Sequence, residues 1–120
     1  MAHPVLWFEV MGTNGDTLRS FYSALFNWTF KVDGPMQYGV ASTGDERGIP
    51  GGVGHAGEGS KPYGPTFYVE TPDVAASLAD AERLGGKTMM PPTVVGGDMT
   101  IGLLSDPEGH VIGLIQRAAA

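Results

Sequence analysis

The chain has 120 residues, 42% of them hydrophobic, and a formal net charge of −6, which suit one small globular domain that a second subunit would help to stabilise. Its few Lys and Arg residues are scattered, so the basic surface that a nucleic acid or an anionic membrane requires is missing. Because the chain has no cysteine, disulfides, thiolate chemistry and a cysteine metal site are excluded. It also has no apolar run of membrane-spanning length and no signal-peptide pattern, so we expect a cytoplasmic protein.

The first half of the chain predicts a strand, a helix and three further strands. Residues 5–10 are dense in strand-forming side chains, and from residue 16 to residue 26 apolar side chains recur at the spacing of a helix with one buried face. Thr13 or Asn14 can cap this helix. The later strands are expected at residues 28–32, 36–42 and 49–53, the last of them weak because glycines interrupt it.

A linker is predicted at residues 55–64, which are rich in Gly, Ser and Pro, and the same order of elements begins again after it. A strand at residues 66–70 precedes a helix that Thr71 can cap and that Gly85-Gly86 ends. Three more strands are expected at residues 87–90, 99–104 and 111–116, and Pro91-Pro92 is expected to connect the first two of them.

The two halves also share sequence. Met99 stands 63 positions after Met36, and the seven residues that begin at each of these methionines match in pattern. Each copy is too short to be a domain by itself, so a repeat at this spacing predicts two units packed together with facing sheets around a pocket. We therefore predict the α+β class, with tandem βαβββ units at residues 1–54 and 65–120 of a single domain.

Three motifs carry a resemblance to a known family. They are, in chain order, Phe21-Tyr22 with Leu25-Phe26-Asn27-Trp28, then Leu84-Gly85-Gly86, then Asp106-Pro107-Glu108-Gly109 before a final apolar strand. Together they resemble the vicinal oxygen chelate superfamily, the glyoxalases, bleomycin-resistance proteins and extradiol dioxygenases. The resemblance covers nearly the whole chain. It implies a glyoxalase-like homodimer in which each βαβββ unit contributes a curled mixed sheet to a cup that holds a small molecule.

In the metal-dependent enzymes of this family, His, Glu or Gln side chains from the first and last strands of each unit hold a divalent ion. The corresponding positions here are Trp7, Thr66, Gly113 and either Pro50 or Gly51. None of these supplies a ligand, because an indole nitrogen only donates. A shift of two residues would bring in Glu9 or Glu70, but two carboxylates fall short of the about three ligands of a catalytic ion. We expect no metal and no cofactor, and His3, His55 and His110 are expected to be surface or turn residues.

The cup is expected to be aromatic. If Trp7 faces inward, strand alternation places Glu9 beside it and places Thr66, Tyr68 and Glu70 on the equivalent face of the second unit, while Phe8, Val10, Phe67 and Val69 face the helices. Tyr38 and Ile101 occupy matching places in the repeated third strands. The predicted ligand-binding residues are Trp7, Tyr38, Thr66, Tyr68 and Ile101, and the candidate acid–base catalysts are Glu9 and Glu70. The alternatives are that Trp7 and Tyr68 fill core and that the glutamates pair with arginines at a dimer seam.

Three functions are compatible with this sequence. The favoured one is a metal-independent protein that binds a flat or partly apolar small molecule, as a homodimer with no nucleic-acid or membrane partner. The second is a lyase, isomerase or dioxygenase that uses a displaced ion or acid–base chemistry at Glu9 or Glu70. The third is a protein-interaction module whose cup is closed by Trp7 and Tyr68. The fold by itself does not choose among them, and the sequence does not identify the ligand.

Overall fold

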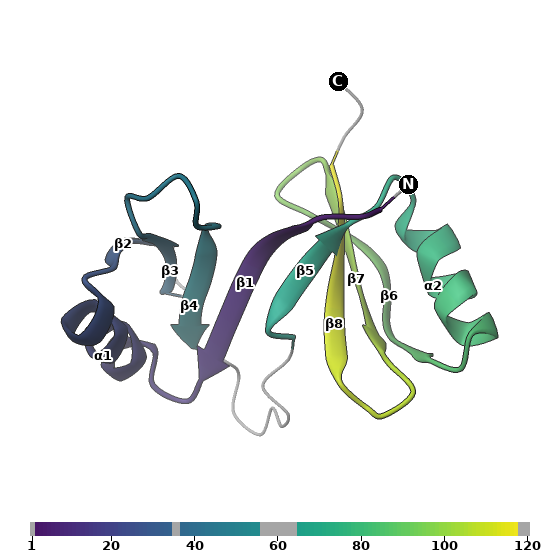
Figure 1. Cartoon of the computed structure of the whole chain (residues 1–120), viewed down its shortest axis with the longest axis horizontal. Coiled ribbons are helices and arrows are strands. Elements are labelled where there is room, and N and C mark those ends of the chain that lie inside the picture. The colour runs from purple at the N-terminus through teal and green to yellow at the C-terminus, as the bar shows by residue number, and fades with distance from the viewer. Residues whose placement is uncertain (1, 35–36, 56–64, 118–120) are drawn as a thin grey trace. The chain divides into compact units, whose positions relative to one another are not determined.

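The computed structural model describes residues 2–34, 37–55 and 65–117 (Figure 1). Its elements follow the order β-α-β-β-β twice, which confirms the predicted α+β class and the two βαβββ units. Neither described helix is long and apolar enough to cross a membrane. The first set is β1 (Val5–Gly12), α1 (Gly15–Phe26), β2 (Thr29–Asp33), β3 (Tyr38–Ser42) and β4 (Gly51–His55). The second set is β5 (Phe67–Glu70), α2 (Val74–Arg83), β6 (Lys87–Val95), β7 (Met99–Ser105) and β8 (Val111–Gln116).

The chain forms two compact units, here called the N-terminal unit (Trp7–Gly64) and the C-terminal unit (Met1–Leu6 with Pro65–Ala120). The N-terminal sheet has the order β2-β3-β4-β1, with β1 parallel to β4 and the other neighbours antiparallel. The C-terminal sheet has the matching order β6-β7-β8-β5, with β5 parallel to β8. The start of the chain belongs to the C-terminal unit, where the Glu70 backbone N–H donates to the Pro4 carbonyl at 2.9 Å.

Both helices begin where a side chain caps them. Asn14 accepts a hydrogen bond at 3.0 Å from a backbone N–H in the first turn of α1, which confirms one of the two expected caps. In α2 the cap is Asp73, which accepts at 3.0 Å, so the prediction that Thr71 caps this helix was wrong. Thr71 is buried instead, with its hydroxyl 2.6 Å from Ser77 Oγ. Gly85, with a φ of +103°, lies just past the end of α2, as expected.

The largest difference from the predicted elements lies in β6. Pro91-Pro92, expected to be a connection, lie within this strand, where its register with β7 shifts between Met90 and Thr93. β6 is at the edge of the C-terminal sheet and its ladder with β7 is irregular at these residues, which is where a strand tolerates proline. At the other predicted connection, His55 belongs to β4, and the rest of the expected linker lies outside the described residues.

Each helix packs on one face of the sheet in its own unit (Figure 1). In the C-terminal unit Val74 and Leu78 of α2 form a core cluster with Leu114, against which Val69 and Leu104 pack. This confirms that Val69 faces the helix. Strand alternation then places Tyr68 and Glu70 on the opposite face of that sheet.

The N-terminal unit has an aromatic core between its helix and its sheet. The Phe8 ring of β1 lies 5.3 Å from the Trp28 ring, and Trp28 stacks on Tyr22 of α1 at 5.4 Å between ring centroids. Phe8 therefore faces α1, as predicted. Trp7 and Glu9, its neighbours in β1, lie on the opposite face.

Candidate functional site

Three of the predicted site residues meet on the face of the N-terminal sheet opposite α1. Trp7 and Glu9 are two residues apart in β1 and so point to the same side of the sheet, and Tyr38 is the first residue of β3. The Trp7 indole Nε1–H donates to the Tyr38 hydroxyl at 2.9 Å, and that hydroxyl donates to Glu9 Oε2 at 2.7 Å. An indole, a phenol and a carboxylate are thus joined in one hydrogen-bonded set, which we call the Tyr38 row.

Glycines of β4 make room for this row. Because β4 lies between β3 and β1, the Tyr38 side chain must cross β4 to reach its two partners. A Cβ on Gly52, the residue paired with Glu9, would lie 1.7 Å from the Tyr38 hydroxyl oxygen, and a Cβ on Gly54 would lie 3.1 Å from Tyr38 Cδ1. The glycines that made β4 a weak strand in the sequence therefore form the surface on which the Tyr38 ring rests. Sequence reasoning missed Gly52, although glycines at alternate positions of one strand were a usable signal.

In the C-terminal unit Tyr68 also lies over a glycine. Tyr68 of β5 is paired with Gly113 of β8, and a Cβ on Gly113 would lie 2.4 Å from the Tyr68 ring, which is 9% exposed. Leu103 of β7 is paired with Gly113 and so lies on the same face of the sheet as Gly113. Ile101 lies on this face too, because residues two apart in a strand point to the same side. Thr66 precedes β5 and is exposed. Tyr68 and Ile101 are thus brought to one face, and Thr66 lies beside its edge.

Glu70, the second candidate catalyst, is ion-paired. Its Oε2 lies 2.5 Å from Arg117 Nε, and its side chain is 25% exposed. Glu70 therefore has an arginine partner, but this partner belongs to the same C-terminal unit, and the expected pairing at a dimer seam is not tested by it. Glu9, on the N-terminal sheet, accepts a hydrogen bond from the Tyr38 hydroxyl.

Three of the positions that the resemblance assigns to metal ligands, Trp7, Gly51 and Gly113, offer no side chain that could bind a metal ion. Trp7 offers an N–H that donates to Tyr38, and the Tyr68 ring takes the space of a Cβ on Gly113. In the N-terminal unit Gly51 faces α1, since its Cβ would lie 2.3 Å from the Phe8 ring. Within the described part of the chain, no three His, Asp or Glu side chains gather in a group that could hold an ion.

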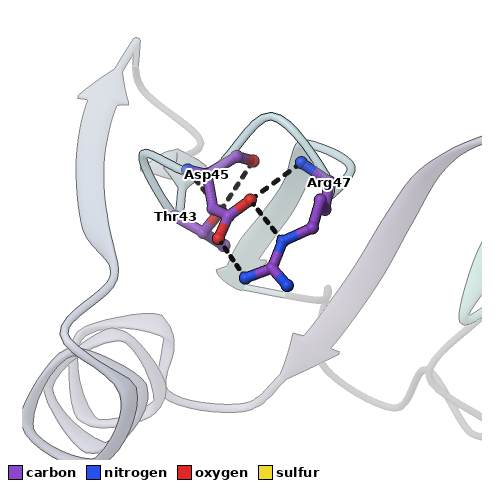
Figure 2. Close-up of polar contacts among 3 residues, drawn as sticks. All are labelled: Thr43, Asp45 and Arg47. Carbon is purple, nitrogen blue, oxygen red and sulfur yellow. Dashed lines mark hydrogen bonds and ion pairs between the residues drawn. The ribbon is translucent and has the colours of Figure 1, made fainter.

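A separate hollow of about 260 Å³ lies beside the loop between β3 and β4, lined by residues between Ser42 and Pro50. Figure 2 shows that Asp45 in this loop is paired with Arg47, with Oδ2 2.7 Å from Nη2 and Oδ1 3.0 Å from Nε. The Arg47 side chain lowers the pKa of Asp45 below its ordinary value. Because these two charges already neutralise each other and no residue of the Tyr38 row lines the hollow, we do not regard it as the candidate site.

The three histidines lie in exposed positions, His3 before β1, His55 at the end of β4 and His110 in the turn between β7 and β8. In that turn Asp106 Oδ1 accepts from the backbone N–H of Glu108 at 2.9 Å and from that of His110 at 3.0 Å, and Asp106 Oδ2 lies 2.9 Å from His110 Nδ1. The backbone hydrogen bond from His110 is the main cause that holds the pKa of Asp106 below its ordinary value. Asp106 thus organises the turn.

The lowered pKa of Asp106 predicts an acid-dependent contribution to stability. Because the carboxylate binds its proton less readily in the folded chain than in the unfolded chain, its contribution is present above the unfolded pKa of about 3.9 and is lost as the pH falls through the folded pKa. We expect Asp106→Asn to be slightly less stable than wild type near neutral pH, with a difference that shrinks in acid. Urea denaturation at both pH values measures it, and a difference that grows in acid would contradict this prediction.

No family profile matches the chain. Two curated mycobacterial proteins, from Mycobacterium bovis and Mycobacterium tuberculosis, both carry the provisional name glyoxylase CFP32. Each is 29% identical to this chain, and the match covers 92% of this chain. The chain spans 44% of these relatives, less than half of their length.

Solved structures share the fold at lower identity. A glyoxalase/bleomycin resistance protein/dioxygenase superfamily member from Vibrio splendidus has a TM-score of 0.64 at 11% identity, over 97% of this chain and 99% of that one. A methylmalonyl-CoA epimerase from Streptomyces coelicolor, in complex with 2-nitronate-propionyl-CoA, has a TM-score of 0.62 at 18% identity, over 100% and 98%. Together with the repeated βαβββ order, this likeness shows that the chain has the glyoxalase-like fold, and the names of the curated relatives agree with the resemblance to the vicinal oxygen chelate superfamily.

Proposed function

We propose that the chain binds a flat or partly apolar small molecule on the face of the N-terminal unit that carries the Tyr38 row, without a metal ion at the family's usual position. The observation that supports this is the row itself, in which two aromatic side chains stand next to a carboxylate. The rings of Trp7 and Tyr38 offer rigid apolar contact area, and Glu9 can orient a polar or cationic group. The epimerase of the same fold holds a CoA ester, so a small organic ligand is a reasonable expectation here.

The other predicted contacts remain part of this proposal. Tyr68 and Ile101 offer a second apolar face in the C-terminal unit, with Thr66 as a polar group beside it. We also retain the homodimer as a prediction, because Phe21 and Leu25 of α1 are more than half exposed and apolar surface of this kind favours association. Sedimentation of the purified protein tests the oligomeric state.

An enzyme of lyase or isomerase type is the second candidate. It is favoured by the position of Glu9, whose carboxylate is held by Tyr38 on the same face and could accept a proton from a bound substrate. Metal analysis of protein purified without chelator tests whether such an enzyme would use a displaced ion. About one tightly held ion per chain would favour a metal-dependent enzyme, since such a site binds its ion firmly.

Ligand binding tests the proposal. A thermal-shift screen of planar aromatic compounds and CoA esters, followed by calorimetric titration in EDTA, provides the ligand and its affinity. We expect Tyr38→Phe to weaken binding about tenfold, because the ring remains while the hydroxyl that joins Trp7 to Glu9 is lost.

The matched control is Arg47→Ala, which changes the loop hollow in the same unit and is expected to bind the ligand as wild type does. Two results would contradict the proposal. One is a Tyr38→Phe affinity equal to that of wild type, and the other is a loss of binding when EDTA is added.

A further inference from the structure

We propose that Arg19 is a positioning residue for the Tyr38 row. Its buried guanidinium, on the α1 side of the N-terminal sheet, fixes the backbone segments that carry and support the Tyr38 ring on the other side. The consequence for ligand binding rests on the proposed function, whereas the structural consequence can be measured without a ligand.

The Arg19 side chain is held by specific acceptors. The residue is 6% exposed, which is unusual for a charged group because burial of a cation costs free energy unless its N–H groups find acceptors. Nη1 donates to the Gln37 carbonyl at 2.7 Å and to the Val53 carbonyl at 3.2 Å, and Nη2 pairs with Asp16 on the same helix. The guanidinium therefore connects α1 to two segments of the sheet.

Both acceptors are next to the place where the Tyr38 ring is held. Gln37 directly precedes Tyr38 and has a φ of +49°, a left-handed conformation that few non-glycine residues adopt. The Arg19 hydrogen bond to the Gln37 carbonyl favours this conformation and so sets the direction in which the chain enters β3. Val53 lies between the two glycines on which the ring rests. Arg19 thus holds the segment that carries the ring and the strand that supports it.

Glycines open the space for Arg19 as they do for Tyr38. A Cβ on Gly39, the residue after Tyr38, would lie 2.5 Å from Arg19 Cδ, and a Cβ on Gly15 would lie 2.8 Å from Arg19 Nη1. Gly52 on β4 opens the corresponding space for the Tyr38 ring. At this point in the N-terminal unit, glycines admit an arginine on one face of the sheet and a tyrosine on the other.

Three variants separate positioning from a general loss of stability. Arg19→Met keeps much of the apolar stem but removes the guanidinium, and Arg19→Lys keeps the charge but loses the planar fork in which Nη1 reaches the carbonyls while Nη2 pairs with Asp16. The matched control is Arg83→Met, because Arg83 pairs with Asp80 at the same three-residue spacing on α2 but is exposed. The control is expected to behave as wild type in every measurement below.

The indole N–H signal of Trp7 in a 15N-labelled protein reports on the row directly, because this N–H donates to Tyr38. The chain has two tryptophans, and Trp7→Phe identifies which signal is which. We expect Arg19→Met to move the Trp7 signal toward its position in Tyr38→Phe, and Arg19→Lys to move it part of the way. With a ligand from the screen, Arg19→Met should also lose about tenfold in affinity.

An unmoved Trp7 signal in folded Arg19→Met protein overturns the inference. If Arg19→Met does not fold, Arg19→Lys decides in the same way, with the melting temperature as the measure of folding. A displaced Trp7 signal with unchanged ligand affinity supports the positioning role of Arg19 and contradicts the proposed binding site, so the two failures can be told apart.

Discussion

Gly52→Ala is expected to abolish the hydrogen bonds of the Tyr38 row while the N-terminal unit stays folded. The added Cβ would lie 1.7 Å from the Tyr38 hydroxyl oxygen and 1.8 Å from Cζ, so something must move. β4 is hydrogen-bonded on both sides, whereas the far end of the Tyr38 side chain can turn away. We expect a loss of about 1–3 kcal/mol in the free energy of unfolding from crowding. Ligand affinity should fall about 30-fold, or ~2 kcal/mol, because the row no longer forms.

Gly54→Ala is the matched control for this prediction. It lies on the same strand and face, but its Cβ would be 3.1 Å from Tyr38 Cδ1, which a small shift accommodates. Urea denaturation and calorimetric titration of both variants measure the two effects. The double variant Gly52→Ala with Tyr38→Ala should be relieved of the crowding but should not regain affinity. If the Gly52→Ala protein binds the ligand as tightly as wild type does, the Tyr38 row is not part of the binding site.

Gly113→Ala should destabilise the C-terminal unit, because Tyr68 has less freedom than Tyr38 to move. The added Cβ would lie 2.4 Å from Cδ2 and 2.8 Å from Cγ of Tyr68. Cγ is close to the backbone and cannot swing away, and the side chain is largely buried. We expect the free energy of unfolding to fall by about 1–3 kcal/mol in urea denaturation.

A double-mutant cycle with Tyr68→Ala identifies the cause of that loss. If the Tyr68 ring is what the new Cβ meets, Gly113→Ala should cost much less in the Tyr68→Ala background. An equal cost in both backgrounds would mean that the ring is not responsible. The expected coupling would also mean that any larger side chain at residue 113 must displace Tyr68.

Strand alternation predicted the faces of the sheets correctly. It placed Trp7 and Glu9 on one face of β1 and Phe8 on the other, because alternation depends only on local backbone geometry. The internal repeat predicted the two βαβββ units for a similar reason, since each copy carries its own strand and helix pattern. The roles of these residues in ligand binding or catalysis remain predictions.

The sequence could not predict features that depend on distant parts of the chain. The Tyr38 hydroxyl reaches both partners only because β4 lies between β3 and β1 and has glycine at residue 52. Arg19 was missed because an arginine on a helix is usually solvated, and its burial depends on Gly15 and Gly39. The prediction of the α2 cap failed for a local reason. Thr71 and Asp73 are both good capping residues, and only the backbone geometry shows which one is used.

The Trp7 indole N–H signal, followed while wild-type protein is titrated in EDTA with a ligand from the screen, tests most directly whether the Tyr38 row binds a ligand without a metal ion. We expect this signal to shift until binding saturates, while the signal of Trp28, which packs between Phe8 and Tyr22 on the α1 side, stays in place. Saturable binding that leaves the Trp7 signal unmoved, or binding that disappears in EDTA, would contradict this expectation.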